Sequence, residues 1–391
     1  MDTDVIAQQI GAVSEAELKD VLEKFLAGQS IEGQLSSVVE PLAAPSMGNG
    51  TLGLWRVRGH NEPGSDSVPW SVIVKAIDPC APVVIAGFNH TWRELEALRS
   101  GRLATPKSGL QPVPTYAIHD RPDGTAWVWM KDLSNEQMPP WTSKAFLDSA
   151  RHIGQFNGSM TGLDSKYGNW VATDGSTDRR ISLLDDYSSA VESVARNTHH
   201  PGVAEAGSVI GIDRMLSLAD DLRILIASTN TAPRSIAHND CHARNLFPID
   251  AGITFAIDWA SVGMAPVGID GGGLTGASIT WSQHEANQIE QIESQVFAQY
   301  MLGLRECGWD GDESTIRLSY LSTFASYVLH LVFMLNSFIT EGPFAAGQRR
   351  RLSVDGDEAY EQIAKRLGQF VPLVDEALEL AGEYPARTPT A

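Results

Sequence analysis

The sequence contains little cysteine and far fewer basic than acidic residues, and both shortages argue against whole classes of protein. Only three cysteines occur in 391 residues, Cys80, Cys241 and Cys307. They form no Cys-x-x-Cys pair for zinc and no disulfide framework, which fits a reducing compartment. Lysine and arginine total 29 against 48 aspartate and glutamate residues, a formal net charge of −19. Such a chain lacks the broad basic surface that nucleic acid or anionic lipid needs, and it leans slightly toward a cationic small molecule.

Signals for export or membrane insertion are also scarce. The N-terminus is acidic and lacks the basic start and apolar run of a signal peptide. The stretch 318–340 is apolar and long enough to span a bilayer, but it contains several serine, threonine and asparagine residues and no second such stretch accompanies it. We therefore expect a buried helix at 318–340, no membrane partner and a cytoplasmic protein.

Hydrophobic periodicity divides the chain into a β-rich first third and a helical remainder. A capping box at Ser14 predicts an amphipathic helix that ends near Leu26, and a second short helix is expected at 91–98. The other early segments read as strands, at 52–57, 70–77, 116–119 and 126–130. Later segments have helical spacing, at 143–157, 213–228, 284–304, 316–338 and 358–383. We expect an α+β protein with a small β-rich lobe, residues 1–132, and a large mainly helical lobe, residues 133–391.

One segment inside the helical part has the polar spacing of a phosphoryl-transfer site. His238, Asp240 and Asn245 form the pattern H-x-D-x-x-x-x-N. Two short apolar runs follow at 246–249 and 253–257, joined by a turn that contains aspartate and glycine. Such a turn between β-like runs predicts a hairpin.

Antiparallel pairing in this hairpin would bring two oxygen-bearing side chains to the same end. Asn245 precedes the first strand and Asp258 follows the second. Amide and carboxylate oxygens suit Mg²⁺, which also brings its own waters and substrate phosphates. Asp240 lies in the loop before the hairpin and remains available to accept a proton from a hydroxyl, as phosphoryl transfer requires. The alternative interpretation makes Asp258 a helix cap, Asn245 a turn residue and His238 a core histidine.

These residues resemble the aminoglycoside phosphotransferase and choline kinase-like group of small-molecule kinases. The resemblance rests on the H-x-D-x-x-x-x-N pattern, on Ile257-Asp258-Trp259 and on the glycine-containing segment that leads to Asp270. It covers about residues 46–340 and is most specific at 238–270.

The resemblance implies a bilobal, protein kinase-like fold and a role for each matching residue. Asp240 would be the catalytic base, Asn245 and Asp258 the magnesium ligands, and Asp270 a structural residue. His242 matches a histidine common in these kinases, where it would contact the transferred phosphate. Cys241 departs from the pattern, because the family often has an aliphatic residue there.

A glycine-rich segment in the first third is a candidate phosphate-binding loop. Gly48, Gly50 and Gly53 form G-x-G-x-x-G, and a predicted strand follows rather than the helix of a Rossmann fingerprint. A glycine-rich turn between strands can cover the phosphates of ATP with its backbone amides. The alternative is a tight surface hairpin.

Lys75 is the candidate cation of this lobe. It ends a predicted strand on the same face as apolar Ile73 and Ile77, where a lysine either reaches outward or meets an anion. The kinase-like interpretation has it bind the α- and β-phosphates and pair with a glutamate of the next helix. Glu94 and Glu96 lie on different faces of that helix, and we prefer Glu94 because family members often carry an Arg-Glu pair there.

The resemblance also locates the binding sites of the adenine ring and of the acceptor. Backbone groups at Met130, Lys131 and Leu133 would bond to adenine where the two lobes join. The acceptor would lie among helices of the large lobe, for which the candidate lining residues are Trp281, Tyr327, His330, Phe333, Asn336 and Glu341.

The sequence thus predicts an ATP- and Mg²⁺-dependent phosphotransferase acting on a hydroxyl of a small molecule, such as an aminoglycoside, amino sugar or sugar. A protein kinase is the first alternative, but Asp258 is followed by Trp-Ala rather than Phe-Gly and no Ala-Pro-Glu segment follows. A catalytically silent kinase-like binding module is the second. That alternative would require the loss of Lys75, Asp240, Asn245 or Asp258, and all four are present.

Overall fold

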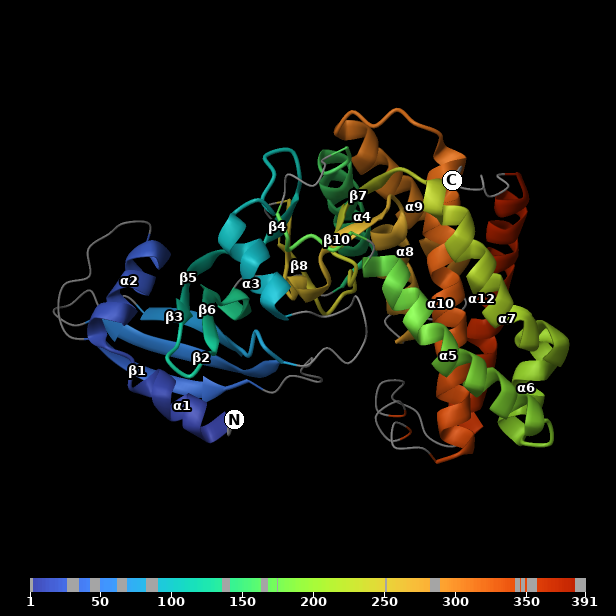
Figure 1. Ribbon diagram of the computed structural model, residues 1–391, viewed down its shortest axis with the longest axis horizontal. Coiled ribbons are helices and arrows are strands. Elements are labelled where there is room, and N and C mark those ends of the chain that lie inside the picture. The colour runs from blue at the N-terminus through green and yellow to red at the C-terminus, as the bar shows by residue number, and fades with distance from the viewer. Residues whose placement is uncertain are drawn as a thin grey trace.

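A computed structural model describes most of the chain, in segments. The described residues are 3–26, 35–42, 50–61, 69–81, 91–135, 141–162, 168–173, 175–249, 252–281, 289–341, 345, 349 and 357–383. Figure 1 shows a β-rich N-terminal part beside a mainly helical C-terminal part. The prediction of an α+β protein with these two parts is confirmed, while the boundary at residue 132 stays a prediction.

The N-terminal part is built on one five-stranded antiparallel sheet. Its strand order is β1-β2-β3-β6-β5. The strands are β1 (Leu35–Pro41), β2 (Thr51–Asn61), β3 (Pro69–Ile77), β5 (Thr115–Asp120) and β6 (Ala126–Lys131). All but β1 were predicted, and β1 was missed because its sequence does not alternate between polar and apolar residues.

Helices cover both faces of this sheet. Side chains of neighbouring strand residues point to opposite faces, so Val72 and Val74 pack with α1 (Thr3–Gly11) and α2 (Glu15–Phe25). The other face carries Ile73 and Lys75, and α3 (Thr91–Ser100) packs there. The predicted cap of α2 is present, because the Ser14 hydroxyl accepts from the backbone of Glu17.

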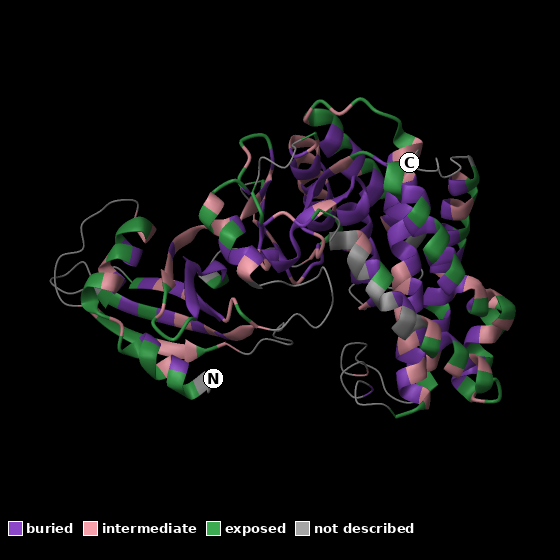
Figure 2. Cartoon of the chain, viewed as in Figure 1, coloured by how far each residue is buried: buried purple, intermediate pink, exposed green. Residues whose placement is uncertain are grey.

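The C-terminal part is organised around one long apolar helix, α10 (Glu313–Ile339), which is enclosed by other helices (Figures 1 and 2). By length and composition α10 could cross a membrane, but 78% of its most apolar window is buried inside the protein. The prediction of a buried helix is therefore confirmed. Its neighbours are α5 (Gly175–Arg196), α7 (Ile212–Ser228), α8 (Ile269–Thr280) and α12 (Asp357–Glu383).

The remaining helices complete this part. They are α4 (Ser143–Ser159), which packs on α9 (Ile289–Glu306), and α6 (Pro201–Ile210), which packs on α12. The predicted helix at 284–304 corresponds to α9, and its residues 284–288 lie outside the described ranges. The sequence did not reveal α5, α6 or α8.

Helix α8 was missed because it contains glycine at 271, 272, 273 and 276, a composition that disfavours a helix. Close packing explains most of these residues. A Cβ on Gly272 would lie 2.3 Å from the backbone oxygen of Tyr320, and one on Gly276 would lie 2.2 Å from the Tyr327 ring. The glycines therefore let α10 approach α8 closely.

Two small sheets position the loops between the two parts. The predicted hairpin consists of β8 (Leu246–Ile249) and β9 (Ile253–Ala256), and β4 (Leu110–Pro112) pairs in parallel with β9. The second sheet pairs β7 (Arg234–Ala237) with β10 (Gly263–Pro266). The loops that follow β7 and β9 are thus held side by side.

Candidate active site

A buried aspartate fixes the loop that carries Asp240. The side chain of Asp270 accepts hydrogen bonds from the backbone N–H groups of His238 and Asn239, each at 2.8 Å, and from Asn157 Nδ2 at 3.1 Å. Asp270 is 2% exposed. Three donors around a buried carboxylate satisfy its need for partners, so Asp270 is a structural anchor of this loop.

His238 joins the same loop to the segment before Asp258. Its ring is fully buried, with Nε2 at 2.8 Å from the backbone oxygen of Ile257. Its Nδ1 accepts from the backbone N–H of Asp240 at 3.3 Å. His238 is therefore buried, as the alternative interpretation of a core histidine expects. Its two ring nitrogens also connect the loop of Asp240 to the segment before Asp258.

Two non-glycine residues of these loops have left-handed backbone conformations. Both Asn239 and Asp258 have φ of 62°. Asn239 is held there by hydrogen bonds from its Nδ2 to the backbone oxygens of Ser261 and Gly263, at 3.1 and 3.4 Å. Such a conformation costs about 1–3 kcal/mol and is typical of functional sites. In this conformation Asp258 Oδ1 lies 3.1 Å from Lys75 Nζ.

Asp240 and Asn245 lie against each other. Asn245 Nδ2 donates to Asp240 Oδ2 at 3.0 Å and to the Asp240 backbone oxygen at 3.1 Å. The backbone oxygen of Asn245 accepts from Ile257 N at 3.0 Å, so Asn245 does lie at the end of the hairpin beside residue 258. With its amide nitrogen engaged by Asp240, Asn245 retains its amide oxygen for another ligand.

Lys75 connects the sheet to the loop that follows β9. Its Nζ lies 2.7 and 2.9 Å from the two carboxylate oxygens of Glu94 and 3.1 Å from Asp258 Oδ1. Glu96, the other candidate partner, is exposed and pairs with Arg99. The structure therefore brings Lys75, Glu94 and Asp258 together, although 164 residues separate Glu94 from Asp258.

The charges around Lys75 shift its pKa and that of Glu94. Burial alone would lower the pKa of Lys75, but the charges of Asp258 and Glu94 outweigh it and raise that pKa above its ordinary value. Burial raises the pKa of Glu94, and the charge of Lys75 opposes this. Lys75 is thus a permanently charged ammonium at neutral pH.

The site has the charge and the ligand atoms that a divalent cation needs. When ionised, Lys75, Glu94, Asp240 and Asp258 carry a net charge of −2. The Asp258 side chain is 39% exposed, and one of its oxygens is not bonded to Lys75. No group of three or more acidic, histidine or cysteine side chains suited to a metal occurs among the described residues. A cation held by one carboxylate and one amide oxygen, with phosphates and water completing the shell, fits Mg²⁺.

An apolar surface beside Lys75 could hold a nucleotide base, and only part of it was predicted. Ile73, Met130 and Leu133 belong to one apolar cluster with two half-buried residues of the C-terminal part, Phe247 and Ile257. Phe247 lies two residues after Asn245, and Ile257 directly precedes Asp258. Their place next to the predicted metal ligands was the signal that could have identified them.

The structure limits how the end of β6 can meet a nucleotide base. The Lys131 N–H donates to the Pro114 oxygen at 2.9 Å, so this amide is already engaged. The Lys131 ammonium lies 5.7 Å from the centre of the Phe255 ring. Base contacts from this segment would therefore come from groups other than the Lys131 amide.

The predicted glycine-rich loop is described only in part. Gly48 lies outside the described residues, Gly50 has φ of 91°, and its oxygen accepts from Asp78 N at 2.7 Å. Gly53 lies inside β2 at a shift in the pairing with β3, where a Cβ would be 2.2 Å from the Trp55 ring. Gly50 therefore supplies a turn conformation, and Gly53 makes room for Trp55.

Basic and aromatic side chains meet beside Asp240. His242 Nε2 lies 3.5 Å from Asp240 Oδ2, and its ring lies edge-on to Trp281 at 5.3 Å. The Arg244 guanidinium lies 4.4 Å from the centre of the Trp281 ring. Arg244 was not among the predicted site residues.

The other predicted acceptor residues differ in how near they come to this loop. The Tyr327 hydroxyl donates to the backbone oxygen of Gly273. Gly273 in turn lies close to Cys241, because a Cβ added to it would be 3.6 Å from the Cys241 backbone oxygen. His330 stacks with Phe333 further along α10, whereas the exposed Glu341 pairs with Arg349. Trp281 and Tyr327 therefore lie next to the Asp240 loop.

Comparisons with known proteins support the fold. No protein-family model and no curated protein matches this chain. Among solved structures, an aminoglycoside phosphotransferase from Alicyclobacillus acidocaldarius subsp. acidocaldarius matches with a TM-score of 0.51 at 11% identity, over 83% of this chain and 92% of that one. An amicoumacin kinase in complex with AMP-PNP, Ca²⁺ and Ami has a TM-score of 0.48 at 13% identity, over 97% of this chain and 98% of that one.

A spectinomycin phosphotransferase in complex with ADP and spectinomycin gives a TM-score of 0.48 at 12% identity, over 91% of this chain and 99% of that one. The first of the three likenesses shows that this chain has the bilobal kinase-like fold. The resemblance noted in the sequence to aminoglycoside phosphotransferases is thereby confirmed at the level of the fold.

Proposed function

We propose that the protein is an ATP- and Mg²⁺-dependent phosphotransferase of the aminoglycoside phosphotransferase and choline kinase-like group. It would move the γ-phosphate of ATP to a hydroxyl of a small molecule, such as an aminoglycoside, amino sugar or sugar. The observation that supports this most strongly is the convergence of Lys75, Glu94 and Asp258 beside the bonded pair Asp240 and Asn245. Distant segments of the chain come together here, and their residues would serve as the cation, the metal ligands and the base that phosphoryl transfer needs.

The Lys75 side of the site would bind the nucleotide. Lys75 is oriented by Glu94 and would contact the phosphates, while Asp258 Oδ2 and Asn245 Oδ1 would hold Mg²⁺. When bound, the metal would neutralise charge on the phosphates. The base would lie on the apolar cluster that includes Ile73 and Phe247.

The Asp240 side would bind the acceptor. Asp240 is fixed by the hydrogen bond from Asn245 and would orient the acceptor hydroxyl and take its proton. His242, 3.5 Å from Asp240, would lie beside the transferred phosphate. Because the transition state of phosphoryl transfer is loose, positioning and charge neutralisation supply most of the rate.

A turnover screen tests the proposal. The purified protein is incubated with Mg²⁺-ATP and a panel of hydroxyl-bearing aminoglycosides, amino sugars, sugars and amino alcohols, and ADP release is followed. A stimulated rate that disappears with a chelator and in Asp258→Ala supports the proposal. Phosphorus NMR of the product should show a phosphate monoester. A nucleotidylated product, or phosphorylation of proteins but of no small molecule, would contradict it.

A further inference from the structure

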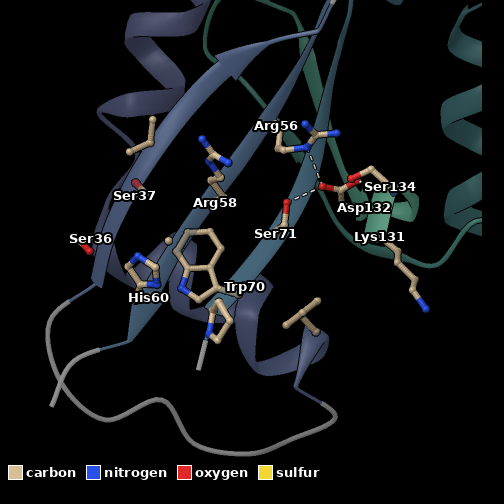
Figure 3. A pocket seen from close by; sticks show the side chains of 14 residues that line it. Ser36, Ser37, Arg56, Arg58, His60, Trp70, Ser71, Lys131, Asp132 and Ser134 are labelled. Carbon is tan, nitrogen blue, oxygen red and sulfur yellow. Dashed lines mark hydrogen bonds and ion pairs between the residues drawn. The ribbon is translucent and has the colours of Figure 1, made fainter. Parts of the chain in front are cut away.

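A cavity of about 850 Å³ lies over the β1–β2–β3 side of the five-stranded sheet (Figure 3). Arg56, Arg58 and Ser71 are among its lining residues. Arg56 lies directly opposite Ile73, and Arg58 directly opposite Ser71. Since side chains at every second position share a face, these residues lie on the same face as Lys75. Lys131, Asp132 and Ser134 also line the cavity, so it reaches the segment that follows Met130.

Asp132 is the point where three segments meet at this cavity. Its Oδ2 accepts from Arg56 Nε at 2.8 Å and from the Ser71 hydroxyl, and its Oδ1 accepts from Ser134 N at 2.9 Å. Figure 3 shows the first two bonds converging on one carboxylate. Asp132 is 6% exposed. One buried side chain thus joins β2, β3 and the segment that follows β6.

The hydrogen bonds keep this carboxylate charged. Burial alone would raise the pKa of Asp132, but the bonds from Ser134, Ser71 and Arg56 outweigh burial and hold that pKa below its ordinary value. At neutral pH Asp132 is therefore an ionised acceptor. Hydrogen bonds to an ionised group are stronger than those between neutral groups.

The Asp132 junction, which is this carboxylate with its bonds to Arg56, Ser71 and Ser134, lies close to the proposed nucleotide site. Arg56 lies two residues along β2 from Leu54, which is opposite Lys75, a separation of about 7 Å along a strand. Asp132 itself lies between Met130 and Leu133, both part of the apolar cluster beside Lys75. The junction therefore holds the segment 130–134 against β2 and β3, and β3 is the strand that carries Ile73 and Lys75.

We propose that Asp132 is a positioning residue for the nucleotide, because it ties β2 and β3 to the segment 130–134 and so fixes where Met130 and Leu133 lie relative to Ile73 on the base site. This inference rests on the proposed function. Asp132 acts through Arg56 and the backbone, and it does not touch the reacting atoms. Its loss should weaken nucleotide binding while leaving turnover at saturating nucleotide close to that of the unchanged protein.

A neighbouring ion pair supplies a matched control. Arg58 lines the same cavity on the same strand, but it pairs with Glu40 of β1 rather than with the segment after β6. The Arg58 side chain is 58% exposed, and an exposed pair contributes little. Arg58→Leu therefore removes an arginine from the cavity without releasing the junction.

The experiment compares four variants of the full chain, Asp132→Asn, Arg56→Leu, their combination and Arg58→Leu. Asparagine keeps the size of the side chain but removes its charge and replaces one accepting oxygen with an N–H₂ group, which must face a donor on one side or the other. Calorimetry with Mg²⁺ and a non-hydrolysable ATP analogue gives the dissociation constant, and initial rates give kcat and KM. Thermal unfolding shows the temperature range in which each variant is folded.

We expect Asp132→Asn and Arg56→Leu each to raise the dissociation constant about tenfold, with kcat within about threefold of the unchanged protein. The double variant should bind the analogue no more weakly than the more weakly binding of the two single variants, because both substitutions remove the same interaction. The dissociation constant of Arg58→Leu should stay within about twofold of that of the unchanged protein.

Two results would overturn the inference, and they are distinguishable. If Asp132→Asn unfolds at a lower temperature but binds the analogue as the unchanged protein does, Asp132 only stabilises the fold. If the unchanged protein does not bind the analogue at all, the proposed function fails and this inference fails with it.

Discussion

Asn245 donates a hydrogen bond from its side-chain nitrogen to Oδ2 of Asp240 across 3.0 Å. The hydrogen bond joins the proposed base to a proposed metal ligand, and it leaves the Asn245 amide oxygen to face another ligand. Asp258, the second proposed ligand, is bonded instead to Lys75. The two aspartates therefore belong to different halves of the site, and their substitutions should have different effects.

Asp258→Ala should abolish Mg²⁺-dependent nucleotide binding, whereas Asp240→Ala should leave it nearly intact. The first substitution removes a metal ligand and a partner of Lys75. The second leaves Asn245 with the Asp240 backbone oxygen as its acceptor. Calorimetric titration with Mg²⁺ and a non-hydrolysable ATP analogue checks this, and equal loss in the two variants would contradict the assignment. Titration without Mg²⁺ serves as the control.

The sequence predicted the parts of the site that depend on local patterns. The hairpin after Asn245 has the predicted pairing, with Leu246 opposite Ala256. This follows because a turn between two apolar runs specifies its own register. The choice of Glu94 over Glu96 agrees with the ion pair that Lys75 makes.

Features that depend on distant contacts could not be predicted in this way. Asp132 is an unremarkable aspartate in the sequence, and its importance appears only when β2 and β3 bring Arg56 and Ser71 to it. Helix α8 has a composition that argues against a helix, and its packing against α10 accounts for Gly272 and Gly276. Tertiary contact overrides intrinsic propensity in this case.

Glycine positions in α8 provide a test of that packing. Gly272→Ala should destabilise the protein by about 1–3 kcal/mol, because its Cβ would meet the Tyr320 oxygen at 2.3 Å. Gly273→Ala is the matched control, since its nearest neighbour would be at 3.6 Å. Alanine there should be neutral or stabilise by up to about 1 kcal/mol through helix propensity. Chemical denaturation measures both, and equal shifts in the two variants would show that α8 and α10 are not in close contact.

Removal of Lys75 should make the stability of the protein depend more strongly on pH, because buried Glu94 then lacks its partner. In Lys75→Met the charge that opposes the raised pKa of Glu94 is gone, while burial and Asp258 still raise it. A carboxyl group with a raised pKa in the folded state binds its proton more tightly there than in the unfolded chain. Its contribution to stability is full below the unfolded pKa of about 4.3 and is lost as pH rises through the folded pKa.

The variant should therefore be more stable near pH 5 than near pH 8. At pH 8 its loss relative to the unchanged protein should be about 3–5 kcal/mol, the cost of leaving a buried charge without its partner. Unfolding by denaturant at several pH values measures the effect. Lys75→Met combined with Glu94→Gln should lose the added pH dependence. Parallel pH profiles of Lys75→Met and the unchanged protein would show that Glu94 is not held by Lys75.

The last prediction concerns the chemical step. Asp240→Asn keeps the size of the side chain but removes the carboxylate that would orient the acceptor hydroxyl and take its proton. Turnover should fall by about 10²–10⁴, the usual contribution of a positioned base, while the apparent affinity for ATP changes little. Initial rates at varied ATP and acceptor concentrations separate these quantities, and circular dichroism confirms that the variant is folded. Full activity in Asp240→Asn would remove Asp240 from the mechanism.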